Sequence, residues 1–481
     1  MSISSTSVPG TELSRRAWGA LLVLCTALFL DALDVSMVGV ALPSIRADLG
    51  MSTSSLQWVV SAYVLGYGGF LLLGGRAADL LGRRRVFLIA LGVFAVASTL
   101  GGFADDGTLL IVTRFIKGLS AAFTAPAGLS IITTTFAEGP ARNKALSIYT
   151  ATGATGFSLG LVFGGLLTEL DWRLAFLLPA PVALVALIAG LRLVPHSGRA
   201  ARGRGSFDVA GAVTLTSAML LLVYSLVQAP TVGWLSLRTV VSLAAVATLL
   251  AAFVWREQRV PAPLIRLGIF RRTTLVRANL GVMALAAWVG FQFLATLYMQ
   301  QLRGWSALET GLAIFPAGAL VATLSPRMAP LIGRFGPTRL AVAGLLSITL
   351  AYLLFLPVGL ESSYLLGLLP TFLLAGVGFG LAFGPLNVAA TTGVAPEEQG
   401  LAGGLVNTSM QLGAALVLAI VTAVVNAGTT TGAPEDVLSA YHAALFVPIA
   451  AALLGVVAMV QRRPAAVVAE LPAETALDEA A

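Results

Sequence analysis

Fourteen long, continuous apolar runs recur along this chain, and they constrain its fold more than any other feature. Each is close to the roughly 20 apolar residues that a helix needs to cross a bilayer, and none alternates as barrel strands do. Only 11% of the 481 residues are charged, against about 25% in a soluble chain. We therefore predict an all-α polytopic membrane protein with spans at 17–41, 56–77, 86–103, 108–132, 144–167, 174–193, 208–228, 238–255, 275–298, 309–329, 339–357, 364–389, 402–426 and 441–460.

The basic residues indicate which way these spans run. Of the 29 lysines and arginines, two lie inside the fourth run and most of the others gather in the tails and alternate loops. Four fall in loops on the opposite side: Arg46, Arg173, Arg238 and Arg303. Under the positive-inside rule the basic side is cytoplasmic. We therefore predict a multi-pass protein of the cytoplasmic membrane with both termini in the cytoplasm.

The stretch GRFGPTRL, residues 333–340, resembles a second copy of GRAADLLGRRRVFL, residues 75–88, with Gly333 where the first copy has Asp79. We therefore expect two six-helix bundles joined by a linker that itself contains two extra spans. The second half resembles a degenerate repeat of the first, an arrangement typical of transporters. The expected parts are a cytoplasmic tail at 1–16, an N-terminal bundle at 17–193, a linker at 194–273 that holds spans 208–228 and 238–255, a C-terminal bundle at 274–461, and a cytoplasmic tail at 462–481.

Several functional classes are disfavoured by composition. Cys25 is the only cysteine, and the chain has two histidines, so the sequence predicts neither a disulfide nor a metal site. Neither Lys117 nor Lys144 lies in a phosphate-binding G-x-x-x-x-G-K-[ST] motif. The net charge of +7 is attributed to membrane orientation rather than to nucleic-acid binding. We expect no enzyme activity and no cofactor.

Two carboxylates interrupt the first run. Asp31 and Asp34 lie in FLDALDVSM, and a buried carboxylate is costly unless it is paired or has a function. Arg114 and Lys117 interrupt the fourth run in the same way. Counted from the outer ends of the two runs, both sets lie roughly 10 and 14 Å deep. We predict two ion pairs, Asp34 with Arg114 and Asp31 with Lys117, although a purely structural ion-pair role is an alternative.

The loop after the second run carries a recognisable motif. GRAADLLGRRRVFL, residues 75–88, resembles the signature loop of the major facilitator superfamily at Gly75, Asp79, Gly82, Arg83 and Arg84. Glycines allow a tight turn and arginines suit the cytoplasmic surface, so the loop fits a gating hinge. A simple positive-inside loop is the alternative interpretation.

Three further stretches resemble the fourteen-helix drug:proton antiporter branch of that superfamily. They are LDVSMVGVALP (33–43), RFIKGLSAA (114–122) and GFSLGLVFGG (156–165). The last contains a glycine stripe that lets another helix approach closely, for which we prefer a packing role; its members are Gly156, Gly160, Gly164 and Gly165. Departures from the branch's usual motifs are Gly39 for asparagine, Lys117 for glutamine and Leu161 for proline.

The resemblance implies a proton-coupled exporter of drugs or antibiotics that works by alternating access. Under that reading Asp34, as the motif acid, is the main coupling residue, with Asp31, Arg114 and Lys117 around it. Gln292, Asn407 and Gln411 are candidate pocket groups, although lone amides in membrane helices more often bond between helices. Expected partners are protons, the lipid bilayer and an apolar or amphipathic small molecule, and we expect a monomer. The alternatives are a proton-coupled importer of a small organic solute and, less favoured, a non-transporting receptor or enzyme.

Overall fold

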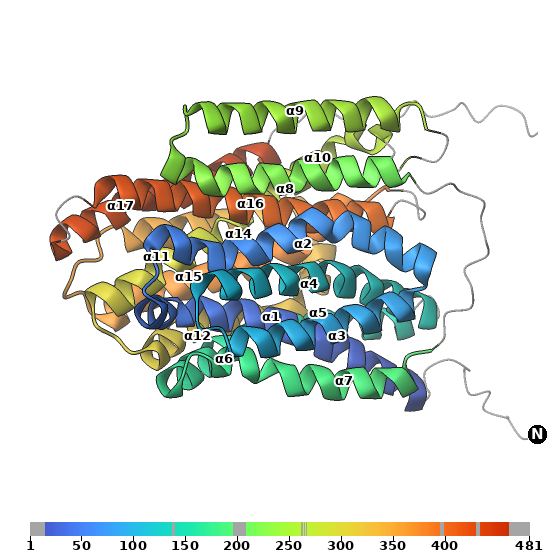
Figure 1. Ribbon diagram of the computed structural model, residues 1–481, viewed down its shortest axis with the longest axis horizontal. Helices are drawn as coiled ribbons and strands as arrows, with labels where there is room; N and C mark the ends of the chain where they lie inside the picture. The colour runs from blue at the N-terminus through green and yellow to red at the C-terminus, as the bar shows by residue number, and fades with distance from the viewer. Residues whose placement is uncertain are drawn as a thin grey trace, which may run out of the picture.

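Long helices running side by side form most of the chain (Figure 1). The computed structural model describes residues 15–136, 140–195, 208–260, 263, 265, 267–394, 399–429 and 433–460, and within them no strand occurs. The α-helices are α1 Arg15–Leu49, α2 Thr53–Leu81, α3 Arg83–Gly102, α4 Gly107–Thr135, α5 Pro140–Leu170, α6 Leu174–Leu177, α7 Pro179–Leu193, α8 Val209–Val232, α9 Leu237–Glu257, α10 Thr273–Leu285, α11 Trp288–Leu297, α12 Ala307–Leu324, α13 Met328–Phe335, α14 Pro337–Phe355, α15 Leu369–Thr391, α16 Gln399–Gly428 and α17 Pro434–Val460. Shorter turns are η1 Leu267–Arg271, η2 Tyr298–Leu302, η3 Ser325–Arg327 and η4 Tyr364–Leu368.

The predicted spans correspond to these helices. Among the described residues, 13 helical stretches are long and apolar enough to cross a membrane, judged by length and composition. Each coincides with one predicted run. The remaining run, 56–77, lies within α2, which has 29 residues. The prediction of an all-α, multi-pass membrane protein is confirmed.

Three of the predicted runs are interrupted rather than continuous, and in 309–329 the interruption is η3, between α12 and α13. Between α10 and α11 the backbone hydrogen bonds join residues three apart instead of four. The amide of Ala287 donates to Ala284 O (3.1 Å), and the amide of Val289 donates to Ala286 O (3.1 Å). No proline or glycine marks this break in the sequence. The run 174–193 is split by Pro179, which begins α7.

The halves meet mainly along two helix pairs. α5 of the first half packs on α12 of the second, and α2 packs on α16. The inserted hairpin lies over one of these seams, because α8 contacts both α2 and α16 while α9 packs on α8 (Figure 1). Each half has its own internal packing, with α1 on α5 and α4 on α2 in the first and α14 on α15 and α10 on α17 in the second.

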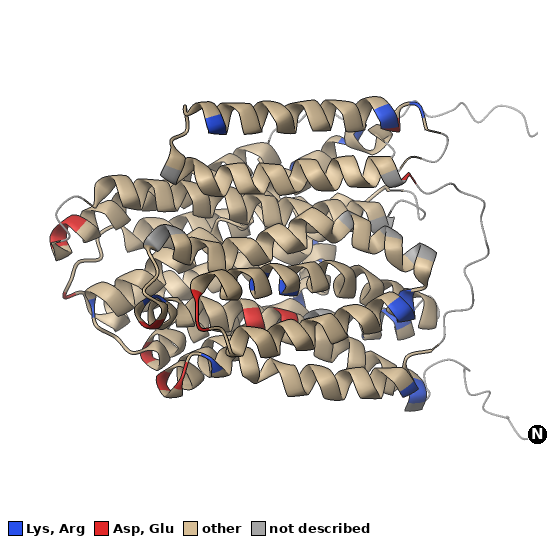
Figure 2. Cartoon of the chain, viewed as in Figure 1, with Lys and Arg blue, Asp and Glu red and all other residues tan. Residues whose placement is uncertain are grey.

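Charged residues are distributed unevenly along the bundle. Figure 2 shows most basic residues at the end where α1 begins and many acidic residues at the opposite end. A few charges of both signs lie halfway along the helices (Figure 2). Charges at that depth are costly in a membrane and point to the candidate site.

Candidate functional site

The site is a buried charge cluster formed by Asp31 and Asp34 of α1 and by Arg114 and Lys117 of α4. Asp34 and Lys117 are 0% exposed and Arg114 is 1% exposed. α4 packs against α1, α2 and α3, and these helices enclose the three charges almost completely. Charges buried this completely need partners within the protein.

Asp34 receives both basic residues. Arg114 Nη1 donates to Asp34 Oδ2, and Lys117 Nζ donates to Asp34 Oδ1. The predicted pair of Asp34 with Arg114 is therefore confirmed. The predicted pair of Asp31 with Lys117 is wrong. Arg114 and Lys117 lie about one turn apart on α4, and both long side chains reach the two oxygens of one carboxylate.

The two cations are held by further groups on neighbouring helices. Arg114 Nε donates to the carbonyl of Val59 in α2 (2.9 Å), and its guanidinium lies 4.7 Å from the ring centroid of Tyr63. Lys117 Nζ donates to Ser98 Oγ of α3 (2.9 Å). The cluster thus ties α4 to three other helices. These contacts could not be predicted from the sequence, because Ser98 and Val59 carry no charge that would mark them.

Aromatic rings complete the surroundings of the lysine. Lys117 Nζ lies 4.8 Å from the ring centroid of Phe94 and 5.2 Å from that of Phe176. The Ser98 hydroxyl in turn donates to the carbonyl of Phe176 (2.9 Å). Cation–π attraction stabilises an ammonium that has left water. The environment therefore suits a charged lysine paired with Asp34.

Asp31 is in a different environment. It is 9% exposed, and its Oδ2 accepts a hydrogen bond from Thr124 Oγ1 of α4 (3.2 Å). Among the described residues no basic group forms an ion pair with it. Asp31 is therefore the acid of the cluster that a hydroxyl, rather than a cation, supports. Thr124 lies seven residues after Lys117, on the same face of α4, which is the signal that could have identified it.

The signature loop lies between α2 and α3. Gly82 adopts φ +97°, a left-handed conformation that favours glycine. Arg84 Nη2 donates to the carbonyl of Leu191 in α7 (2.5 Å). The side chain of Asp79 lies outside the described residues, so its place in the predicted gating loop stays a prediction.

The glycine stripe of α5 makes close helix contacts. A Cβ added to Gly156, Gly160 or Gly164 would lie 2.6–2.7 Å from backbone atoms of α1, which no side chain could accept. At Gly165 it would lie 2.6 Å from the Cα of Leu308 in α12. These contacts agree with the packing role expected for the stripe. The contact of Gly165 with Leu308 extends this packing role to the seam between the two halves.

The three candidate amides have separate neighbours. Gln292 of α11 is 8% exposed and its Nε2 lies 3.2 Å from where a Cβ of Gly39 would be. The Asn407 amide donates to Gly403 O of its own helix (3.1 Å). Gln411 faces Gly68 of α2, across the other seam. Gln292 is thus the candidate amide closest to α1. It occupies the space that an asparagine side chain, usual at position 39 in the antiporter motif, would need.

Comparisons with known proteins agree with this architecture. A family model described as Major Facilitator Superfamily matches residues 24–418. The cephamycin export protein CmcT of Amycolatopsis lactamdurans is 38% identical over 459 residues, which cover 95% of this chain and 94% of that protein. The puromycin resistance protein pur8 of Streptomyces alboniger is 39% identical over 423 residues, covering 86% and 83% of the two chains.

Solved structures show the same fold. The crystal structure of the nucleoside transporter NupG superimposes with a TM-score of 0.67 at 13% identity, covering 92% of this chain and 100% of that chain. A bacterial homologue of the lysosomal transporter Spinster, solved inward-facing and unoccupied, gives a TM-score of 0.65 at 17% identity, covering 93% and 98%. At this identity the likeness concerns the fold alone.

Proposed function

The chain belongs to the major facilitator superfamily, and on that premise we propose that it is a proton-coupled exporter of antibiotic-type small molecules. The relatives named for cephamycin export and puromycin resistance support the direction and the substrate class. Both cover most of this chain, so the whole transporter is compared rather than one part of it.

The observation that carries the coupling is the division of labour between the two acids of α1. Asp34 is held by two cations, so adding a proton to it would leave Arg114 and Lys117 buried without a carboxylate. A proton added to Asp31 disrupts no ion pair. In this proposal Asp31 exchanges the transported proton, and the Asp34–Arg114–Lys117 triad holds α1 against α4. This reverses the expected ranking, in which Asp34 was the main coupling acid.

The cycle follows from the net charge of the cluster. With both acids ionised, two negative and two positive groups balance. Protonation of Asp31 from the outside leaves one excess positive charge, which favours rocking of one half against the other and release of substrate. Loss of the proton to the cytoplasm restores the neutral cluster for the next substrate. At 100 mV each proton supplies about 2.3 kcal/mol, or roughly 50-fold accumulation.

The proposed orientation has both termini in the cytoplasm. The concentration of basic residues at the end of the bundle where α1 begins supports it (Figure 2). Protons then enter the cluster from the outer side and leave on the inner side, as an exporter driven by the proton gradient requires.

The test uses purified protein in liposomes with an imposed pH gradient and a panel that includes puromycin and a cephamycin. We expect transport of a compound against its gradient, in exchange for protons, that stops when an uncoupler is added. Movement of compound in the same direction as protons would instead establish an importer. Movement that ignores the uncoupler would overturn proton coupling.

A further inference from the structure

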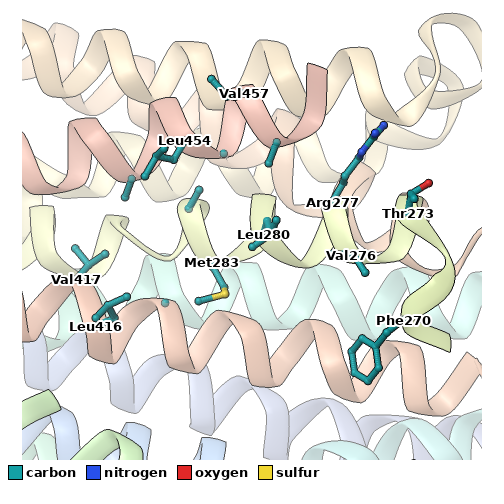
Figure 3. Close-up of a pocket in the computed structure, with 15 residues that line it drawn as sticks. Phe270, Thr273, Val276, Arg277, Leu280, Met283, Leu416, Val417, Leu454 and Val457 are labelled. Atoms are coloured by element: carbon teal, nitrogen blue, oxygen red, sulfur yellow. The ribbon is translucent and has the colours of Figure 1, made fainter. Parts of the chain in front are cut away.

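An apolar groove with one basic end lies on the second half of the molecule, away from the charge cluster (Figure 3). Its volume is about 670 Å³, and its lining comes from η1, α10, α16 and α17. No residue of the cluster contributes to it. The volume is within the roughly 300–1,000 Å³ typical of ligand pockets.

The groove is amphipathic along its length. Figure 3 shows Thr273 and Arg277 at one end and Leu416 and Val417 toward the other, with Leu280 and Met283 between. One end therefore offers a hydroxyl and a guanidinium, and the remainder offers aliphatic surface.

The open side of the groove faces the surroundings of the bundle. Leu280, Val457 and Leu454 are 47%, 52% and 69% exposed. These helices span the membrane, so such side chains are in contact with lipid tails. A ligand of this groove would consequently enter from the membrane rather than from water.

Within the part of the chain that the structure describes, the basic end of the groove has no acidic partner. Arg277 is half-buried and forms no ion pair with any residue that the structure describes. Arg271 and Arg272 lie just before α10 and likewise have no acidic partner among the described residues. A cation at one end of an apolar groove, with two more arginines just before it in the sequence, is complementary to a molecule with an anionic head and an aliphatic tail.

We propose that this groove binds an anionic phospholipid of the cytoplasmic leaflet, with its phosphate at Arg277 and Thr273 and an acyl chain along α10 and α17. Basic pockets between membrane helices on the cytoplasmic side have the chemistry for such headgroups. The transported substrate fits this place less well. All the helices that line the groove belong to one half, so rocking of the halves does not switch its access between the two sides of the membrane.

The test is native mass spectrometry of the purified protein with phosphatidylglycerol and phosphatidylcholine of identical acyl chains. We expect wild type to retain phosphatidylglycerol in preference to phosphatidylcholine. Arg277→Gln should reduce that preference about fivefold, since one basic residue contributes about 1 kcal/mol to an anionic headgroup.

Two controls separate the groove from general positive charge. Arg339 is an exposed arginine near the start of α14 in the same half and does not line the groove, so Arg339→Gln should keep the wild-type preference. Ala458→Trp, or Val457→Trp at the groove mouth if the first variant does not fold, should lower retention of both lipids because the ring fills the acyl path. Equal effects of Arg277→Gln and Arg339→Gln, or unchanged retention in a folded tryptophan variant, would overturn the proposal.

Discussion

The ammonium of Lys117 donates to the Oδ1 atom of Asp34, whose other oxygen already accepts from a guanidinium. The other acid of α1, one turn away, is thereby left with a threonine hydroxyl as its hydrogen-bond donor. Two carboxylates on one helix thus have unequal surroundings, and the predictions for them differ.

Asp31→Asn should leave the protein folded and inserted but abolish proton-driven efflux. An amide still bonds to Thr124 but cannot take up a proton, and no ion pair of the cluster is disturbed. Efflux driven by a pH gradient in liposomes measures the loss, and substrate binding in detergent checks that the site survives. Full coupled transport by Asp31→Asn would refute the role assigned to this residue.

Asp34→Asn should instead destabilise the protein. It leaves Arg114 and Lys117 buried without their carboxylate, and breaking a buried ion pair costs about 3–5 kcal/mol. Thermal unfolding of the purified variant in detergent should show a clearly lowered midpoint.

A second substitution tests whether the unpaired cations cause the loss of stability in Asp34→Asn. Adding Lys117→Gln to Asp34→Asn removes one of the two unneutralised cations and should recover part of the stability. If the double variant is less stable than Asp34→Asn alone, the triad is not the element that holds α1 against α4.

From the sequence, the acids of α1 were expected to meet the bases of α4, and Asp34 was correctly paired with Arg114, but Lys117 was wrongly assigned to Asp31. Depth was counted from an outer end of the first span near residue 41, whereas α1 continues to Leu49 with Pro43 inside the helix. The counted register nevertheless placed Asp34 level with Arg114, as the structure has it. However, register cannot show that two long side chains reach one carboxylate while the next acid meets a threonine.

The fold, too, was predicted only in part from the sequence. Hydrophobic run length was sufficient to predict the membrane spans, because a bilayer imposes that length on every crossing helix. The break after Leu285 was missed, since no proline or glycine accompanies it. The hairpin's position over α2 and α16 was missed as well, because it depends on packing between distant parts of the chain.

The proposed orientation predicts which ends of the helices are labelled from outside the cell. Asp105 precedes α4 and its side chain is 96% exposed, and Arg85 is exposed near the start of α3. With Cys25 replaced by serine, a membrane-impermeant maleimide should label Asp105→Cys in intact cells and Arg85→Cys only after permeabilisation. The reverse pattern would invert the topology.

Gly311 should be intolerant of side chains at the seam between α5 and α12. An added Cβ would lie 2.2 Å from the carbonyl oxygen of Leu161, so the two helices would have to separate. Gly311→Val is expected to reduce efflux strongly, whereas Gly403→Ala, where a Cβ meets nothing within 4 Å, should not. Efflux normalised to the amount of protein in the membrane provides the comparison, and near-normal efflux by Gly311→Val would contradict a tight seam.

Lys117→Gln should change which substrates are preferred. With Lys117 present, the cluster is neutral overall and offers a cationic substrate little net attraction, so neutral compounds should be exported at least as well as dications. The substitution leaves Arg114 as the one cation facing two acids, and this net negative charge should shift preference toward cations. A paired efflux assay with a monocation, a dication and a neutral analogue compares wild type with Lys117→Gln. A glutamine at this position can still bond to Ser98, so an unchanged ranking would mean that the charge of Lys117 has no part in substrate selection.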